Sequence, residues 1–146
     1  MASSAVDGMN EYFDRTLVED FPELYRDRYG DMRQTAMCWG FDCGDGWEQI
    51  IRALSQDLEV LRVKCGLDVR AVQVKEKWGT LRFYADMADG NKWLYAVARH
   101  LINVAEDRSS FTCEICGAWG TRRGGGWIQT LCDECHEKRK TPAASA

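Results

Sequence analysis

The spacing of four cysteines near the C-terminal end constrains this chain more than any other feature. Cys113 and Cys116 form one C-x2-C pair, and Cys132 and Cys135 form a second, with 15 residues between the pairs. Zn²⁺ prefers four ligands in a tetrahedron, and two residues between paired cysteines let both sulfurs face one ion. The sequence therefore predicts a zinc ribbon in which these four residues hold one Zn²⁺.

The predicted zinc site is structural, because four thiolates leave no coordination position open for water. His136 directly follows Cys135 and is the alternative fourth ligand, but we expect it to be an exposed neighbour of the site. A piece of about 30 residues cannot build a sufficient core alone. Metal binding should therefore contribute directly to its folding.

The other three cysteines are expected to be packed thiols. The chain has seven cysteines, and an odd number cannot all pair in disulfides. Cys38 and Cys43 lie beside aromatic residues and are predicted to pack against them, with a second metal half-site as the alternative. Cys65 falls on the apolar stripe of a predicted helix and is expected in the core.

Composition and charge favour a soluble globular protein. No stretch approaches the roughly 18 apolar residues of a membrane span, and the N-terminal segment resembles no secretory signal, so we expect a cytoplasmic protein. Residues 1–67 hold 13 acids and 7 bases, whereas residues 68–146 hold 10 acids and 12 bases. An acidic front half repels a phosphate backbone, which disfavours strong nucleic-acid binding without excluding it.

Hydrophobic periodicity predicts an α+β domain over residues 1–108. The clearest helix begins at Asp45, where D-G-W-E resembles a capping box, and ends before Gly66. Its apolar stripe comprises Trp47, Ile50, Ile51, Leu54, Leu58, Leu61 and Cys65. A second long helix is predicted over 92–107.

The rest of the domain is predicted to pack on a short antiparallel hairpin. Strands alternate over 72–78 and 81–85, with Gly79 in the turn and Leu81 and Phe83 facing the core. Residues 9–29 indicate two short helices divided at Pro22, and 31–44 an ordered loop. The zinc ribbon should occupy 109–137 as an appendage, and 138–146 should form a mobile tail because they have nothing to bury.

A group of basic and aromatic residues forms a candidate binding surface. Lysine and arginine residues cluster on the predicted hairpin and near the expected tip of the ribbon, where two tryptophans are close by. Such a surface suits base stacking and phosphate contact, or a protein partner. The alternative is a solvated strand face whose lysines protect an edge. The candidate residues are Arg70, Lys75, Lys77, Arg82, Trp119, Arg122, Arg123 and Trp127.

No catalytic residue is predicted. The sequence has no glycine-rich phosphate loop, no H-E-x-x-H pattern and no G-x-S-x-G pattern. His100 is a lone histidine on a predicted helix face, with no nucleophile placed to use it. We therefore expect a non-enzymatic protein, with an enzyme as the least supported alternative.

Three sequence blocks resemble a group of small bacterial and prophage-encoded proteins. The blocks are CGDGW at 43–47, VKEKWGTLRFY at 74–84 and CEICG…LCDEC at 113–135, and the resemblance extends from about residue 22 onward. It implies a bacterial or phage-infected cytoplasm and a zinc-bearing C-terminal piece. The group has no assigned activity, so the resemblance implies no catalytic residues.

The expected function is a binding module that docks on another protein. Prophage accessory genes often encode inhibitors or adaptors of host machinery, which by analogy suggests a host defence or regulatory factor as the partner. The alternative is a nucleic-acid-binding or transcription-regulatory zinc-ribbon protein. No membrane contact is expected.

Overall fold

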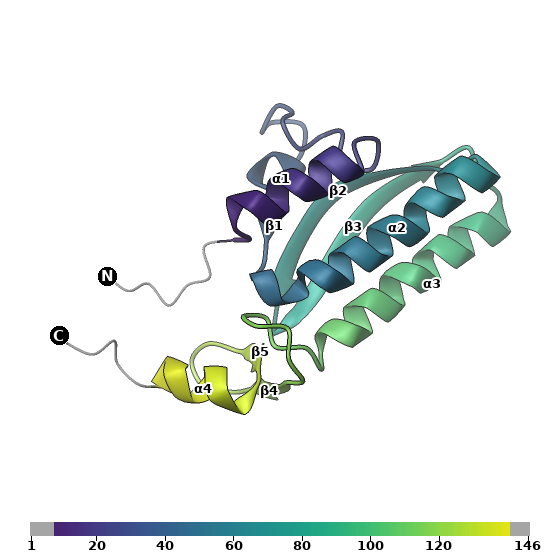
Figure 1. Ribbon diagram of the computed structural model, residues 1–146. Coiled ribbons are helices and arrows are strands. Elements are labelled where there is room, and N and C mark those ends of the chain that lie inside the picture. The colour runs from purple at the N-terminus through teal and green to yellow at the C-terminus, as the bar shows by residue number, and fades with distance from the viewer. Residues whose placement is uncertain (1–7, 141–146) are drawn as a thin grey trace.

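Helices and two small sheets make up an α+β fold in the computed structural model, which describes residues 8–140 (Figure 1). The predicted mixed class is thereby confirmed. The described part excludes residues 1–7, which begin the N-terminal segment that was compared with secretory signals. It also excludes residues 141–146 of the predicted tail. The helices are α1 (Glu11–Asp20), α2 (Glu48–Cys65), α3 (Lys92–Ser109) and α4 (Asp133–Lys140), and the strands are β1 (Phe41–Asp42), β2 (Asp68–Lys77), β3 (Thr80–Ala88), β4 (Thr121–Arg123) and β5 (Gln129–Leu131).

The predicted hairpin is formed by β2 and β3, which pair antiparallel from Lys77↔Thr80 to Asp68↔Ala88. Trp78 and Gly79 form the two-residue turn with φ values of 56° and 84°. Positive φ at both positions is the geometry that matches the twist of the flanking strands. Gly79 in the turn is confirmed, but a tryptophan in the left-handed region carries a conformational cost.

A bulge in β2 changes which side chains face the core. The register shifts between Ala71 and Gln73, so Ala71 and Val74 are both buried while Val72 is only half-buried. The predicted alternation, with Val72, Val74, Glu76 and Trp78 on one face, is therefore wrong at Val72, and it is also wrong at Trp78, which lies in the turn. An extra residue in one strand reverses the inward and outward positions beyond it.

Residues 21–44 differ most from the sequence prediction. The second predicted helix, after Pro22, is replaced by turns, because this segment lies along β2, where the Ala71 N–H donates to the Leu24 carbonyl at 2.8 Å. The predicted loop over 31–44 contains β1, which pairs in parallel with β2 at Phe41↔Val74.

Three helices lie on the same face of the three-stranded sheet, and the core fills the space between them (Figure 1). Tyr25 lies at its centre, with its ring 4.9 Å from that of Phe41 and 6.4 Å from that of Phe83. The predicted inward-facing residues Leu81 and Phe83 are both buried.

Helix α3 also contacts the outer edge of β3. Ser109 Oγ accepts a hydrogen bond from the Leu81 N–H at 2.8 Å. Glu106 Oε2 accepts one from the Phe83 N–H at 2.9 Å. Two backbone donors that face away from β2 are thus satisfied by side chains of the helix.

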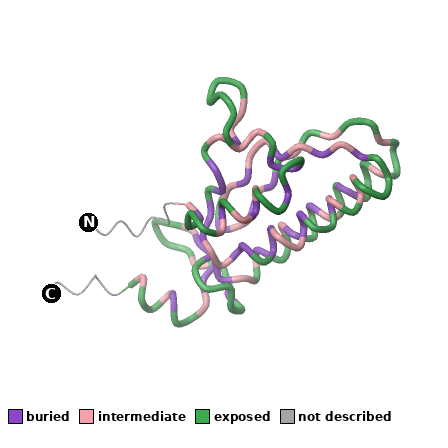
Figure 2. The backbone as a smooth tube through the Cα atoms, turned by 45° about the horizontal axis from the view of Figure 1, so that its top comes forward, coloured by how far each residue is buried: buried purple, intermediate pink, exposed green. Residues whose placement is uncertain are grey.

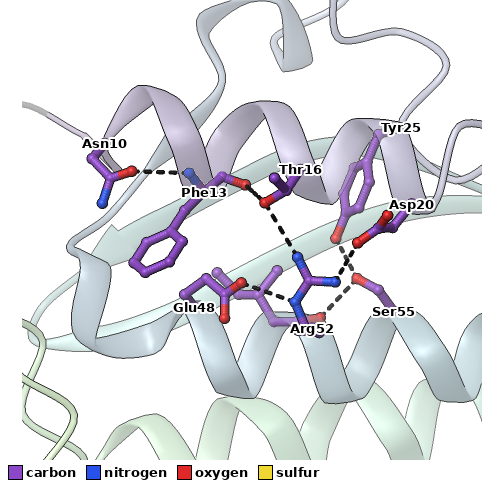
Figure 3. A network of polar contacts seen from close by, with 9 residues as sticks. Asn10, Phe13, Thr16, Asp20, Tyr25, Glu48, Arg52 and Ser55 are labelled. Atoms are coloured by element: carbon purple, nitrogen blue, oxygen red, sulfur yellow. Dashed lines mark hydrogen bonds and ion pairs between the residues drawn. The ribbon is translucent and has the colours of Figure 1, made fainter.

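A polar network joins α1 to α2 (Figure 3). The Arg52 guanidinium donates to Glu48 Oε2 at 2.9 Å, to Asp20 Oδ2 at 2.7 Å and to Thr16 Oγ1 at 3.3 Å. Because one planar guanidinium serves three acceptors from two helices, it fixes their relative position.

The start of α2 is not the predicted capping box. A 3₁₀ turn over Asp45–Trp47 precedes the helix, and the Asp45 carboxylate instead accepts hydrogen bonds from the backbone and side-chain amides of Asn10, both at 2.8 Å. Glu48 pairs with Arg52. Asp45 therefore joins the start of α1 to the start of α2.

The end of α2 confirms one expectation and corrects another. Gly66 adopts the left-handed conformation with φ +77° and ends the helix. Cys65, expected in the core, is exposed. The reversal at Gly66 brings Leu67 into the core instead, where it is completely buried.

Candidate metal centre

The four predicted cysteines converge at the C-terminal end of the fold. Cys113 and Cys116 lie in the turn after α3, Cys132 follows β5, and Cys135 lies in the first turn of α4. Their sulfur atoms all lie within 4.8 Å of one another, and Sγ of Cys116 is 3.6 Å from Sγ of Cys132. Four sulfurs at about 2.3 Å around one ion would be about 3.8 Å apart, and all four thiols are free. The cluster is therefore compatible with a tetrahedral metal site.

Tight backbone turns present both cysteine pairs to a common centre. The Gly117 N–H donates to the Cys113 carbonyl at 2.9 Å, and Gly117 has the positive φ, +82°, that this turn requires. In the second pair the Cys135 N–H donates to Cys132 Sγ at 3.4 Å. This hydrogen bond, together with those from the other three cysteine thiols, lowers the pKa of Cys132 to about 7, which favours the thiolate that binds metals.

His136 is not part of the cluster of close ligand atoms. It is half-buried and not exposed as expected, because its position in the first turn of α4 folds it back beside the second cysteine pair. The backbone N–H of His136 donates to the Cys132 carbonyl at 2.9 Å. The buried ring atom Nδ1 has no hydrogen-bond partner among residues 8–140.

The two remaining cysteines near the aromatic residues have separate surroundings. Cys43 is buried as predicted, and burial together with the nearby Glu114 raises the pKa of its thiol. Cys38 is half-buried, and its thiol donates to the Thr35 carbonyl at 3.2 Å. Neither belongs to the four-cysteine cluster.

The cluster is hydrogen-bonded to residues 43–47, which we call the docking loop. The Gly46 N–H donates to the Glu114 carbonyl at 2.8 Å, and the Gly44 N–H donates to Glu114 Oε2 at 2.9 Å. The indole N–H of Trp47 donates to the Thr112 carbonyl at 2.8 Å. The residues leading into α2 are thereby joined to the first cysteine pair.

The two glycines of the docking loop are required by this close approach. A methyl group at Gly44 would overlap the carbonyl oxygen of Glu114, and one at Gly46 would overlap that of Cys113. Two backbones can touch in this way only where no Cβ intervenes. The sequence signal at this position is the D-G-W-E pattern at 45–48, which predicts a helix cap.

The turn of the β2–β3 hairpin provides the second contact. Thr130 Oγ1 donates to the Gly79 carbonyl at 2.6 Å, and both groups are buried. The docking loop, the hairpin turn and the cysteine segment are the three blocks on which the sequence resemblance rests, and they meet at this one junction.

Glu114 is a buried acid at the junction that sequence reasoning missed. It is only 3% exposed; Oε1 accepts from Gln129 Nε2 at 3.3 Å, and Oε2 accepts from Gly44. Burial raises its pKa to about 7, although both hydrogen bonds oppose the shift. Its contacts on both sides of the junction make it a bridge between the α+β domain and the segment that carries the four cysteines, residues 113–135, which we call the cysteine module.

Two of the predicted surface cations are already paired within the chain. Arg70 contacts Asp86 at 2.7 Å and Asp27 at 3.5 Å. Arg123 contacts Asp133 at 2.8 Å and donates to the Leu131 carbonyl. These two residues therefore stabilise the fold, and their charges are partly neutralised.

The other predicted surface residues remain accessible. Lys75, Lys77, Arg82 and Arg122 form no ion pair within the described part of the chain. Trp119 is 73% exposed and stacks on Phe111 with ring centroids 5.4 Å apart, and Trp127 is half exposed. A hollow of about 300 Å³ is lined by Trp78, Thr80, Arg82, Glu106, Asp107, Ser110 and Arg122.

No family model, curated protein or solved structure matches this chain. Among the helices of residues 8–140, none is long and apolar enough to cross a bilayer. Function is therefore inferred from the cysteine cluster and the surface beside it.

The last helix, α4, continues to Lys140. The first three residues of the predicted mobile tail, 138–140, are therefore helical.

Proposed function

We propose that this chain is a non-enzymatic interaction module whose C-terminal piece is a zinc ribbon. One structural Zn²⁺ is held by Cys113, Cys116, Cys132 and Cys135, a ligand set that suits zinc and closes its coordination sphere. The ion holds the cysteine module in shape, and the module in turn completes a surface at its junction with the α+β domain. Such a site supports binding and offers no position for a reacting water.

Another protein is the partner that the surface favours best. Five of the six tryptophans are 49–81% exposed, and exposed aromatic area is costly in water. Trp78, Arg82 and Arg122 line the same hollow as Ser110. Phe111, which follows Ser110, stacks on Trp119. We call these five residues, without Ser110, the junction surface. Tryptophan and arginine dominate the binding energy of protein interfaces, and Trp78 is held in a left-handed turn. This exposed aromatic group is the observation that carries the proposal.

The sequence resemblance supplies the setting of this function. We place the protein in the cytoplasm of a bacterium or a phage-infected cell, where it inhibits or adapts a host defence or regulatory protein.

Removing aromatic anchors is expected to abolish partner binding. A Trp78→Ser/Trp119→Ser double variant removes two exposed indoles and should weaken binding at least about 100-fold, since interface tryptophans often contribute 2 kcal/mol or more each. Affinity capture from a bacterial lysate, followed by calorimetry with the purified partner, measures the loss.

Trp39→Ser is the matched control for this experiment. Trp39 is 68% exposed and lies in the short 3₁₀ turn before β1, outside the junction surface. A partner that binds the double variant as tightly as the unchanged protein would contradict docking at the junction surface.

Nucleic-acid binding is the second candidate, favoured by the uncovered face of the hairpin. Lys75 lies directly opposite Arg82 in the strand register, and like charges at such positions are destabilising. Lys77 and the half-exposed Tyr84 share this face, while Asp42 on β1 is the acidic neighbour of Lys75. A single-stranded nucleic acid would neutralise the cations and stack on Tyr84.

A salt titration tests the second candidate. If the hairpin face binds single strands, Lys77→Ala should weaken binding to labelled DNA or RNA and reduce the salt dependence by about one counterion. Lys64→Ala, a lysine at the distal end of α2, is the control. Fluorescence anisotropy that shows no binding at low salt would exclude this candidate.

A further inference from the structure

An apolar stripe runs along the outer side of α3. Trp93, Val97, His100 and Val104 follow one another at spacings of four, three and four residues, which places them in one line along a helix. Trp93 is 81% exposed, and the two valines are 42% and 41% exposed. These side chains are separate from the buried residues of α3, which include Ala98, Ile102 and Ala105.

The neighbouring helix also carries exposed apolar residues. Helices α2 and α3 run side by side in opposite directions on the front of the sheet (Figure 1). Val60 and Val63, in the last two turns of α2, are 55% and 61% exposed. Figure 2 shows exposed positions recurring along both helices, so their outer side is uncovered.

We propose that a second copy of this chain covers the outer side of α3, with the two α3 helices packed antiparallel about a two-fold axis. In this arrangement Trp93 of each copy meets Val104 of the other, and Val97 lies near His100 of the other. The contact line between the two α3 helices, which we call the seam, is self-complementary, as an isologous interface requires. This association does not depend on the proposed partner or on the zinc ribbon.

The charges of α3 and its flanking loop identify the second copy as the occupant. Reversing the helix brings Lys92 of one copy beside Asp107 of the other, and Asp89 beside Arg108. All four residues are exposed, and none forms an ion pair within residues 8–140 of one copy. Two-fold symmetry makes each contact twice, so the interface gains four opposite-charge contacts. A parallel arrangement would instead place like residues side by side.

The size of the surface sets the strength of the association. An 18-residue helix is about 27 Å long, and two adjacent helices offer roughly 500 Å² per copy. Stable interfaces bury about 800 Å² per partner. We therefore expect a weak dimer, which forms and dissociates with concentration.

Sedimentation velocity between about 5 μM and 1 mM tests this association. The unchanged protein should shift from monomer to dimer, and Val97→Glu should weaken the dimer at least tenfold by placing a charge in the seam. Val97 is already 42% exposed, so the fold should survive, as circular dichroism would verify. Trp39→Ser is the control variant and should dimerise normally.

A charge exchange tests the antiparallel register. Lys92→Glu and Asp107→Lys should each weaken the dimer about fivefold, because each creates two like-charge contacts. The double variant should restore it to within about twofold. Both substitutions suit the helix macrodipole, so weaker association would not reflect a damaged helix. A monomer up to 1 mM, a dimer insensitive to Val97→Glu, or failure of the double variant to restore binding would each overturn the proposal.

Discussion

Cys113→Ser is expected to release the metal and unfold the cysteine module. Cys113 is completely buried, and a serine hydroxyl cannot replace a thiolate ligand. Structural zinc contributes about 10–16 kcal/mol to the folding of small domains, which exceeds what the few buried residues of this module provide. Because the module is hydrogen-bonded to the start of α2 and to the hairpin turn, the α+β domain should also melt at a lower temperature.

Metal analysis and thermal unfolding measure this effect together. The purified protein should contain one zinc per chain, and a chelator should reproduce the result of Cys113→Ser. Cys65→Ser is the matched control, because Cys65 is an exposed thiol at the far end of α2. Purified protein without stoichiometric zinc, or a Cys113→Ser variant that melts like the unchanged chain, would contradict the metal site.

Gly46→Ala is expected to destabilise the whole chain by about 3 kcal/mol, as overpacking does in a tight contact. The added methyl group overlaps the backbone of Cys113, so the docking loop has to move away. That movement breaks the hydrogen bond from the Gly46 N–H to Glu114 and strains the one from the Trp47 indole to Thr112. The melting temperature should fall by about 10 °C.

Gly124→Ala is the control for the glycine prediction. Gly124 has open space around its Cβ position and no positive φ, so its replacement should change the melting temperature by no more than 2 °C. Equal melting temperatures for the two alanine variants would show that the docking contact does not contribute to stability.

Features set by local chemistry were predictable from the sequence. The two C-x2-C pairs identified the cysteine cluster because turn geometry within four residues aims both sulfurs at one point. The two long helices, at 48–65 and 92–109 in the structure, were predicted over 45–65 and 92–107 because their apolar residues repeat over about five turns. Gly79 marked the hairpin turn for the same local reason.

Features that depend on distant partners were missed. The pattern D-G-W-E at 45–48 fits a capping box locally, yet Asp45 binds Asn10, 35 residues away, and Gly46 binds the cysteine segment. The turns after Pro22 replace a helix because Ala71 supplies a backbone donor to Leu24. Propensity within a short window contains no information about such contacts.

The bulge at Val72 was missed for a different reason. A single inserted residue leaves the composition of the strand unchanged while it reverses the inward and outward positions that follow. Sequence alternation therefore placed Val74 and Lys75 correctly on opposite faces after the bulge, but it placed Val72 on the core face incorrectly.

The contacts of Ser109 and Glu106 with the edge of β3 have a consequence for how this protein behaves when crowded. An edge strand with free N–H groups invites strands from neighbouring chains, which is the usual start of aggregation. Here the Leu81 and Phe83 donors are already occupied by α3, so the sheet cannot easily grow from the end nearest the turn. Newly made chains should therefore avoid strand exchange at this edge as soon as α3 has docked, and Ser109→Ala should make the protein more prone to aggregate at high concentration.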